Sequence, residues 1–152
     1  MAVVLNYLPV FDFGNPKIIT AYAREDISGG QLVFASGADN QVSSGLSSFV
    51  TSDIKVAVCS TDSAQFTGVA LAGASSGTAM SVAIEGAFIL PADGSVFAGQ
   101  AIEQLGGVDS VRALSSGAIP SALYTVGMPG WKCGRALTAA VSGGFAVCYI
   151  SQ

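Results

Sequence analysis

GVALAGASSG at residues 68–77 and GRALTAAVSG at residues 134–143 decide how this chain is organised, because the second segment repeats the first. The shared positions are Gly68/Gly134, Ala70/Ala136, Leu71/Leu137, Ala74/Ala140, Ser76/Ser142 and Gly77/Gly143. A second match, between ISGGQLV at 27–33 and VFAGQAI at 96–102, occurs in the same order and at nearly the same offset. Self-similarity at a fixed spacing indicates a duplicated structural unit. We therefore predict two pseudo-repeats, at about 24–90 and 91–152.

The segments around these matches are typical of short β-strands. They are rich in β-branched or aromatic residues: IITAYA (18–23), IKVAVCS (54–60), AMSVAIEGAFIL (79–90), SVFAGQAIE (95–103) and GFAVCYIS (144–151). Turn-forming clusters such as PADG (91–94) and GMPG (127–130) separate them, and no stretch keeps a helical period. The sequence predicts a single all-β domain over 17–152, a compact barrel or sandwich of short strands.

Alternation along two of these strands predicts which side chains face the core. In the segment 79–90, one face carries Met80, Val82 and Ile84, and the other carries Ser81, Ala83 and Glu85. In the segment 144–151, Phe145, Val147 and Tyr149 oppose Ala146, Cys148 and Ile150, so both faces are apolar. A strand of this kind is covered on both sides, either inside a barrel or at a subunit contact.

Residues 1–16 are predicted to form an extended N-terminal arm. Its apolar side chains are crowded together and closed by a Gly-Asn-Pro turn: Val3, Val4, Leu5, Tyr7, Leu8, Phe11 and Phe13. The segment is either the first strand of the core or an arm laid on a neighbouring chain. Trp131, in a turn between strands, is either an anchor for a partner or a partly buried core residue.

The composition favours a chain that is covered by other chains. Charged residues make up 11% and hydrophobic residues 51%, against about 25% charged residues in a typical soluble domain. Such a chain exposes uncharged surface, which is expected where neighbouring subunits cover it. No apolar run reaches the length of a membrane span, and the N-terminus lacks the basic start of a secretory signal, so we expect synthesis in the cytosol. With a net charge of −4 and scattered cations, direct nucleic-acid binding is not expected.

Catalytic residues are scarce. The sequence contains no histidine, which removes the usual general base and the commonest metal ligand, so we predict no enzyme, cofactor or metal site. Ser52 and Lys55 match an SxxK motif, but the further motifs of that enzyme class are missing. Cys59, Cys133 and Cys148 are expected to be small buried hydrophobes, and the pairing of Cys133 with Cys148 is left open.

The order EDISGGQLV, GVALAGASSGTAMSVAIEGAFILPADGSVFAGQAIEQ and GRALTAAVSGGFAVCYI, across residues 20–152, resembles the small head-decoration (cement) proteins of tailed bacteriophages. ISGGQLV also looks like the opening of a β-clip domain, so the resemblance implies a β-tulip- or β-clip-like fold. It further implies an inert homotrimer on the capsid exterior that binds the major capsid protein and stabilises contacts between capsomers. The arm and Trp131 are then the candidate contacts. The alternative is a trimeric host- or carbohydrate-binding module of a virion fibre or spike.

Overall fold

A computed structural model describes residues 16–36, 54–60, 66–105, 109–114 and 132–151. These residues form nine strands: β1 (Lys17–Ala23), β2 (Leu32–Ala35), β3 (Lys55–Val58), β4 (Phe66–Ala70), β5 (Ala79–Pro91), β6 (Ala101–Leu105), β7 (Ser110–Ala113), β8 (Lys132–Ala136) and β9 (Phe145–Ile150). The predicted all-β class is confirmed. In this part of the chain there is no helix of the length and hydropathy that a membrane span requires.

The first repeat is a closed five-stranded barrel. Its strands follow the order β1-β3-β2-β4-β5, and β5 pairs back onto β1. Four of these pairings are antiparallel, whereas β1 and β3 run parallel, with Tyr22 opposite Lys55. Closure leaves this barrel with few unpaired strand edges, which suits a chain that carries little edge charge.

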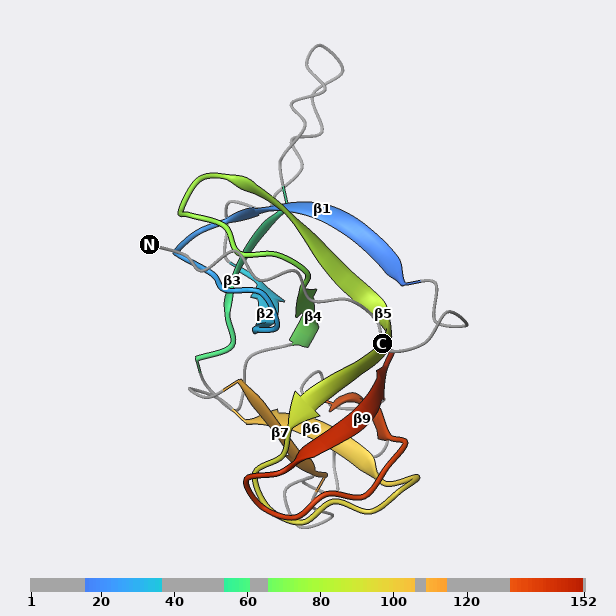
Figure 1. The fold of residues 1–152 in the computed structure, drawn as a ribbon. Helices are drawn as coiled ribbons and strands as arrows, with labels where there is room; N and C mark the ends of the chain where they lie inside the picture. Colours follow the sequence, from blue (N-terminus) through green and yellow to red (C-terminus); the bar gives the residue numbers. More distant parts are fainter. Residues whose placement is uncertain (1–15, 37–53, 61–65, 106–108, 115–131, 152) are drawn as a thin grey trace, which may run out of the picture.

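The second repeat uses the same topology and shares β5 with the first. The far half of this long strand, from Gly86 to Pro91, pairs with β9, and β8, β6 and β7 follow. A parallel bridge between Ala92 and Val111 brings β7 back to the end of β5, as β3 meets β1 in the first repeat. Figure 1 shows β5 running from the upper barrel into the lower one.

Equivalent backbone hydrogen bonds recur in the two repeats. The Gly30 amide donates to the Ala70 carbonyl at 2.8 Å, and the Gly99 amide donates to the Ala136 carbonyl at 2.7 Å. The isolated bridge between Ile27 and Ala74 likewise has its counterpart between Val96 and Ala140. The duplication predicted from the sequence is therefore present at the level of individual hydrogen bonds.

The bounds of the two repeats in the structure differ from the predicted 24–90 and 91–152. The first repeat already includes β1 from Lys17, and the two repeats meet within β5, between Glu85 and Gly86. PADG (91–94) was predicted as a turn between strands. In both repeats a turn follows the first strand, at residues 24–26 and 93–95.

Gly68 and Gly134 explain why the matched segments both begin with glycine. A Cβ on Gly68 would overlap the carbonyl oxygen of Ala83, and a Cβ on Gly134 would overlap the carbonyl oxygen of Tyr149. Ala83 and Tyr149 occupy equivalent positions in the two repeats, on the strands that pair with β4 and β8, respectively. The close approach of two backbones therefore excludes side chains at both sites.

A continuous apolar core joins the two repeats. The larger of two buried clusters takes side chains from both: Leu32, Cys59, Phe66, Val69 and Ala83 from the first, and Phe88, Leu90, Ala92, Val96, Ile102, Val111, Cys133, Ala136, Ala146, Cys148 and Ile150 from the second. Met80 and Val82 face the core as predicted. Ala83 was expected on the opposite face but is fully buried, because it packs where the repeats meet, and Ile84 is only half-buried.

The three cysteines are buried and unpaired, as the prediction of small core hydrophobes requires. The Cys133 and Cys148 thiols lie within 3.6 Å of the carbonyl oxygens of Ile102 and Ala146, respectively. Burial raises the pKa of Cys59 to about 12 and that of Cys148 to about 11, and it raises the pKa of Cys133 as well. All three are therefore neutral thiols at physiological pH.

Candidate functional site

The contact residues predicted from the sequence lie outside the described residues. These are Val3, Val4, Leu5, Tyr7, Leu8, Phe11 and Phe13 of the arm, together with Trp131. Their role in binding stays a prediction. Ser52 of the SxxK motif also lies outside, and Lys55 is the first residue of β3. The described residues contain no group of three His, Cys, Asp or Glu side chains that could hold a metal ion.

The strongest surface feature is an apolar patch on the outside of the second barrel. It consists of Ile89, Pro91, Leu137, Phe145 and Val147, and we call it the second-repeat face. Val147 lies opposite Ile89, and Phe145 lies opposite Pro91, on adjacent strands β9 and β5. The Leu137 amide donates to the Val147 carbonyl at 2.7 Å, which places Leu137 on the other side of β9. The face therefore crosses three neighbouring segments.

Several side chains of the second-repeat face are open to solvent. Ile89 is 43% exposed, Leu137 49% and Phe145 66%, whereas the alternating residues Ala146, Cys148 and Ile150 are fully buried. The sequence had predicted that the last strand is covered on both sides. Its inner side is covered by the barrel, so the outer side is the one left for a partner.

In the first repeat, polar residues replace Ile89 and Val147, whereas Leu137 has Leu71 as its counterpart and Pro91 has Tyr22. Thr20 occupies the position of Ile89, and Ser81 occupies the position of Val147, since Thr20 pairs with Ser81 as Ile89 pairs with Val147. Thr20 and Ser81 are both exposed, and Ala79 stands where the second repeat has Phe145. The same backbone therefore folds with polar or small residues at these positions. Folding therefore does not require the apolar side chains of Ile89, Val147 and Phe145.

Two turns of the second repeat show the same substitution of apolar for polar residues. Phe97 is 67% exposed and Val141 is 72% exposed. The counterpart of Phe97 is Ser28, because their carbonyls accept equivalent hydrogen bonds from the Gln100 and Gln31 amides. The counterpart of Val141 is Ser75, because their carbonyls accept equivalent hydrogen bonds from the Gly144 and Thr78 amides. Exposed apolar side chains are concentrated on one of two otherwise similar barrels, which favours a binding role for that barrel.

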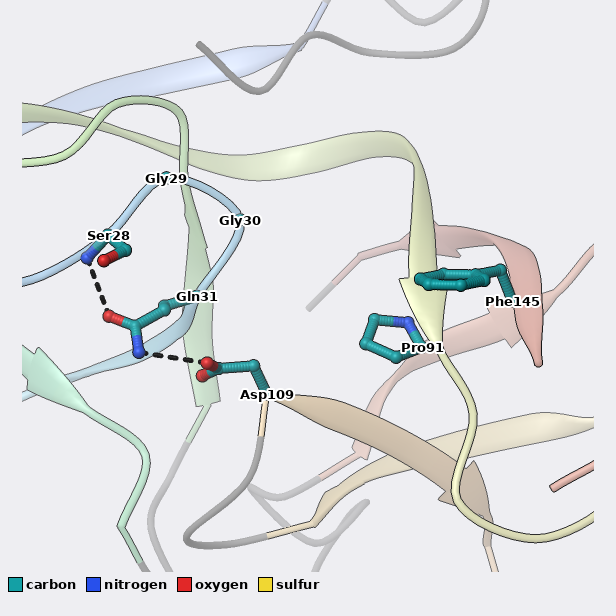
Figure 2. Close-up of a pocket in the computed structure, with 7 residues that line it drawn as sticks. All are labelled: Ser28, Gly29, Gly30, Gln31, Pro91, Asp109 and Phe145. Atoms are coloured by element: carbon teal, nitrogen blue, oxygen red, sulfur yellow. Dashed lines mark hydrogen bonds between the residues drawn. The ribbon is translucent and has the colours of Figure 1, made fainter. Parts of the chain in front are cut away.

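A cleft lies where the two repeats meet, and we call it the inter-repeat cleft. Its volume is about 310 Å³, and its lining combines the first-repeat turn Ser28, Gly29, Gly30 and Gln31 with Pro91, Asp109 and Phe145 of the second repeat. Figure 2 shows the polar side chains on one side and Pro91 with Phe145 on the other. The apolar wall of the cleft is thus one end of the second-repeat face.

Hydrogen bonds fix the polar side of the inter-repeat cleft. The Ser28 amide donates to the Gln31 Oε1 at 2.7 Å, and the Gln31 Nε2 donates to the Asp109 Oδ2 at 3.0 Å. Gln100 makes the first of these bonds in the second repeat, where its Oε1 accepts from the Phe97 amide at 3.0 Å. The glutamine is therefore a shared feature of the turn, and in the first repeat it also orients Asp109 across the junction.

A second group of polar side chains lies at the end of the junction where β1 begins. Glu85 accepts a hydrogen bond from Lys17 at 2.5 Å and another from the Tyr149 hydroxyl at 2.7 Å. The hydrogen bond from Lys17, then that from Tyr149, lowers the pKa of Glu85, and the bond to Glu85 raises the pKa of Lys17. Lys17 is 70% exposed, and Glu85 and Tyr149 are half-buried, so the arrangement connects β1, β5 and β9 without fully burying a charge.

Comparison with solved structures finds the same fold in a phage protein. The chain is similar to the head fiber gp8.5 N base of bacteriophage phi29, with a TM-score of 0.53 and 15% identity, over 89% of this chain and 93% of that one. At this identity the similarity shows a shared fold. No protein-family model and no curated protein matches the chain.

Proposed function

We propose that this chain is a structural component of a bacteriophage head that binds the outer surface of the icosahedral shell as a homotrimer. In this role it stabilises contacts between capsomers, its partner is the major capsid protein, and it catalyses no reaction. The fold shared with a phage head fiber base and the low charge of the sequence support a virion role. Neither nucleic acid nor membrane takes part in the proposed contact.

The observation that carries the proposal is the difference between the two barrels. Ile89 and Val147 replace Thr20 and Ser81 on a backbone that repeats the same pairings. Complete burial of an exposed aliphatic side chain contributes about 1.5 to 3 kcal/mol, and the contribution here is smaller because Ile89 is 43% exposed and Val147 is half-buried. In a trimer each contribution is made three times, and simultaneous release of all contacts becomes rare. A small apolar face is therefore sufficient for stable attachment.

Binding to heads that lack this protein tests the proposal. The double variant Ile89→Thr and Val147→Ser gives the second barrel the residues of the first, and we expect its affinity for heads to fall at least about tenfold. The matched control is Ile18→Thr, which removes an exposed isoleucine from the first barrel and should bind normally. Co-sedimentation measures both. Unchanged occupancy for the double variant would remove the second-repeat face from the shell contact.

The similarity to a head fiber base favours a second candidate, a trimeric host- or carbohydrate-binding module of a fibre or spike on the virion. The two functions differ in where the protein lies. Electron microscopy of decorated heads distinguishes them, because a cement protein gives protrusions between capsomers over the whole shell, whereas a fibre module gives density away from the shell surface.

A further inference from the structure

The inter-repeat cleft presents a carboxylate with unused hydrogen-bonding capacity. Asp109 accepts the hydrogen bond from Gln31 through Oδ2, and no described residue donates to its Oδ1. None of the described lining residues is basic. Gln31 is held by the Ser28 amide, so it fixes the direction of the carboxylate without neutralising its charge. An oriented carboxylate in a cleft whose described lining holds no basic residue is suited to a cationic donor.

The facing wall is apolar and aromatic. Pro91 and Phe145 lie opposite each other on β5 and β9, and Figure 2 shows them across the cleft from Gln31 and Asp109. Aromatic faces attract cations, most often the planar guanidinium of arginine. In the first repeat Ile54 and Ala79 stand at the positions of Asp109 and Phe145, and Tyr22 stands at the position of Pro91, so the carboxylate is missing there. The combination belongs to the junction and is not required by the repeated fold.

We propose that the inter-repeat cleft binds an arginine side chain of the partner protein. The guanidinium donates to Asp109, its plane packs on Phe145, and its methylene stem lies against Pro91. Lysine fits less well, because its ammonium lacks the planar fork and is more strongly hydrated. This inference rests on the proposed function for the identity of the partner, and it adds a specific polar anchor at the end of the second-repeat face.

Titration of the full ¹⁵N-labelled chain with N-acetyl-arginine methylamide tests the site directly. We expect saturable shifts of the Gly29 and Gly30 amides and of the Gln31 side-chain amide, with a dissociation constant of roughly millimolar size for so small a ligand. Asp109→Asn keeps the shape and removes the charge, and it should weaken binding at least tenfold. Asp93→Asn, which removes an exposed carboxylate from another turn, should leave binding unchanged.

Further probes make the outcome specific. N-acetyl-lysine methylamide should bind several-fold more weakly than the arginine probe, and Phe145→Leu should reduce this difference. Shifts with glucose, galactose or N-acetylglucosamine, without a response to arginine, would overturn the proposal in favour of a glycan site. An absence of shifts with every probe would overturn it as well.

Head binding separates this inference from the proposed function. If the wild-type chain binds heads and Asp109→Asn binds them with equal affinity, the function stands and the arginine anchor fails. If the wild-type chain does not bind heads at all, the proposed function fails whatever the arginine titration gives. Loss of affinity in Asp109→Asn, with the Asp93→Asn control unaffected, supports the anchor.

Discussion

Val147 of β9 lies directly opposite Ile89 of β5, at the place where the first repeat pairs Ser81 with Thr20. The first repeat therefore shows which residues are compatible with folding at these two positions. Since the polar pair is compatible with the barrel, folding does not require the apolar pair, and contact with a partner is the role that we propose for it.

Replacement of Ile89 and Val147 by the residues of the first repeat should leave the free energy of unfolding almost unchanged. For Ile89→Thr with Val147→Ser, we expect the free energy of unfolding to stay within about 1 kcal/mol of wild type, the range of strand propensity differences on an exposed face. Urea denaturation measures it. A loss of several kcal/mol would mean that the second-repeat face serves folding.

Substitution of Gly68 or Gly134 by alanine should destabilise the fold. Gly68→Ala and Gly134→Ala each force a Cβ against a carbonyl oxygen, which we expect to destabilise the fold by about 3 kcal/mol. Gly134 should be the more sensitive, because its φ of +147° is also unfavourable for alanine. Gly77→Ala is the control, since no atom lies within 4 Å of its Cβ position and only its φ of +82° opposes the change, at about 1 kcal/mol.

Removal of the Arg112 side chain should lower the free energy of unfolding, because it leaves the buried Glu103 carboxylate without this partner. Its Nε donates to Glu103 at 2.7 Å, and Glu103 is only 2% exposed. Arg112→Ala leaves that carboxylate without its cation, and we expect a loss of about 3 kcal/mol in thermal or urea unfolding. Lys17→Ala breaks an ion pair at the surface and should change stability by less than about 1 kcal/mol. Similar losses for both variants would contradict this interpretation.

The cysteines should resist alkylation until the protein unfolds. Because burial raises the pKa of Cys59 to about 12, its thiol stays protonated at pH 8, where an unfolded cysteine is partly ionised. Mass spectrometry after iodoacetamide treatment should therefore find native chains unmodified and urea-unfolded chains modified at all three sites. Rapid labelling of native protein at pH 8 would show that these thiols are accessible.

Deletion of residues 1–14 tests the predicted arm. If the crowded apolar side chains between Val3 and Phe13 supply part of the shell contact, the truncated chain should fold and fail to bind heads. Circular dichroism monitors the fold and co-sedimentation monitors binding. Wild-type occupancy by the truncated chain would exclude the arm from attachment.

The sequence alone predicts the fold class and the duplication, because glycine and alanine positions are fixed by backbone contacts that both repeats share. Gly68 and Gly134 are conserved between repeats for a steric reason, so they are visible to alignment. By contrast, IITAYA and AFILPA have little in common, and only the strand register shows that Thr20 and Ile89 are equivalent.

The candidate site was only partly visible in the sequence. The two apolar faces of residues 144–151 indicated a covered strand, but they did not distinguish a barrel interior from a subunit contact. The inter-repeat cleft gave no signal, because Gln31 and Asp109 are far apart along the chain and meet only after both barrels close. Local patterns cannot reveal a site that is assembled across a junction.

The continuous path of β5 through both barrels has a consequence for folding. One thirteen-residue strand supplies a wall to each barrel, and the larger buried cluster also crosses the junction. Losing β5 from either barrel therefore opens both, and neither half keeps a complete hydrogen-bonded ring by itself. We therefore expect the two barrels to melt in a single cooperative transition. Opening of the second barrel alone should then be as improbable as unfolding of the whole chain.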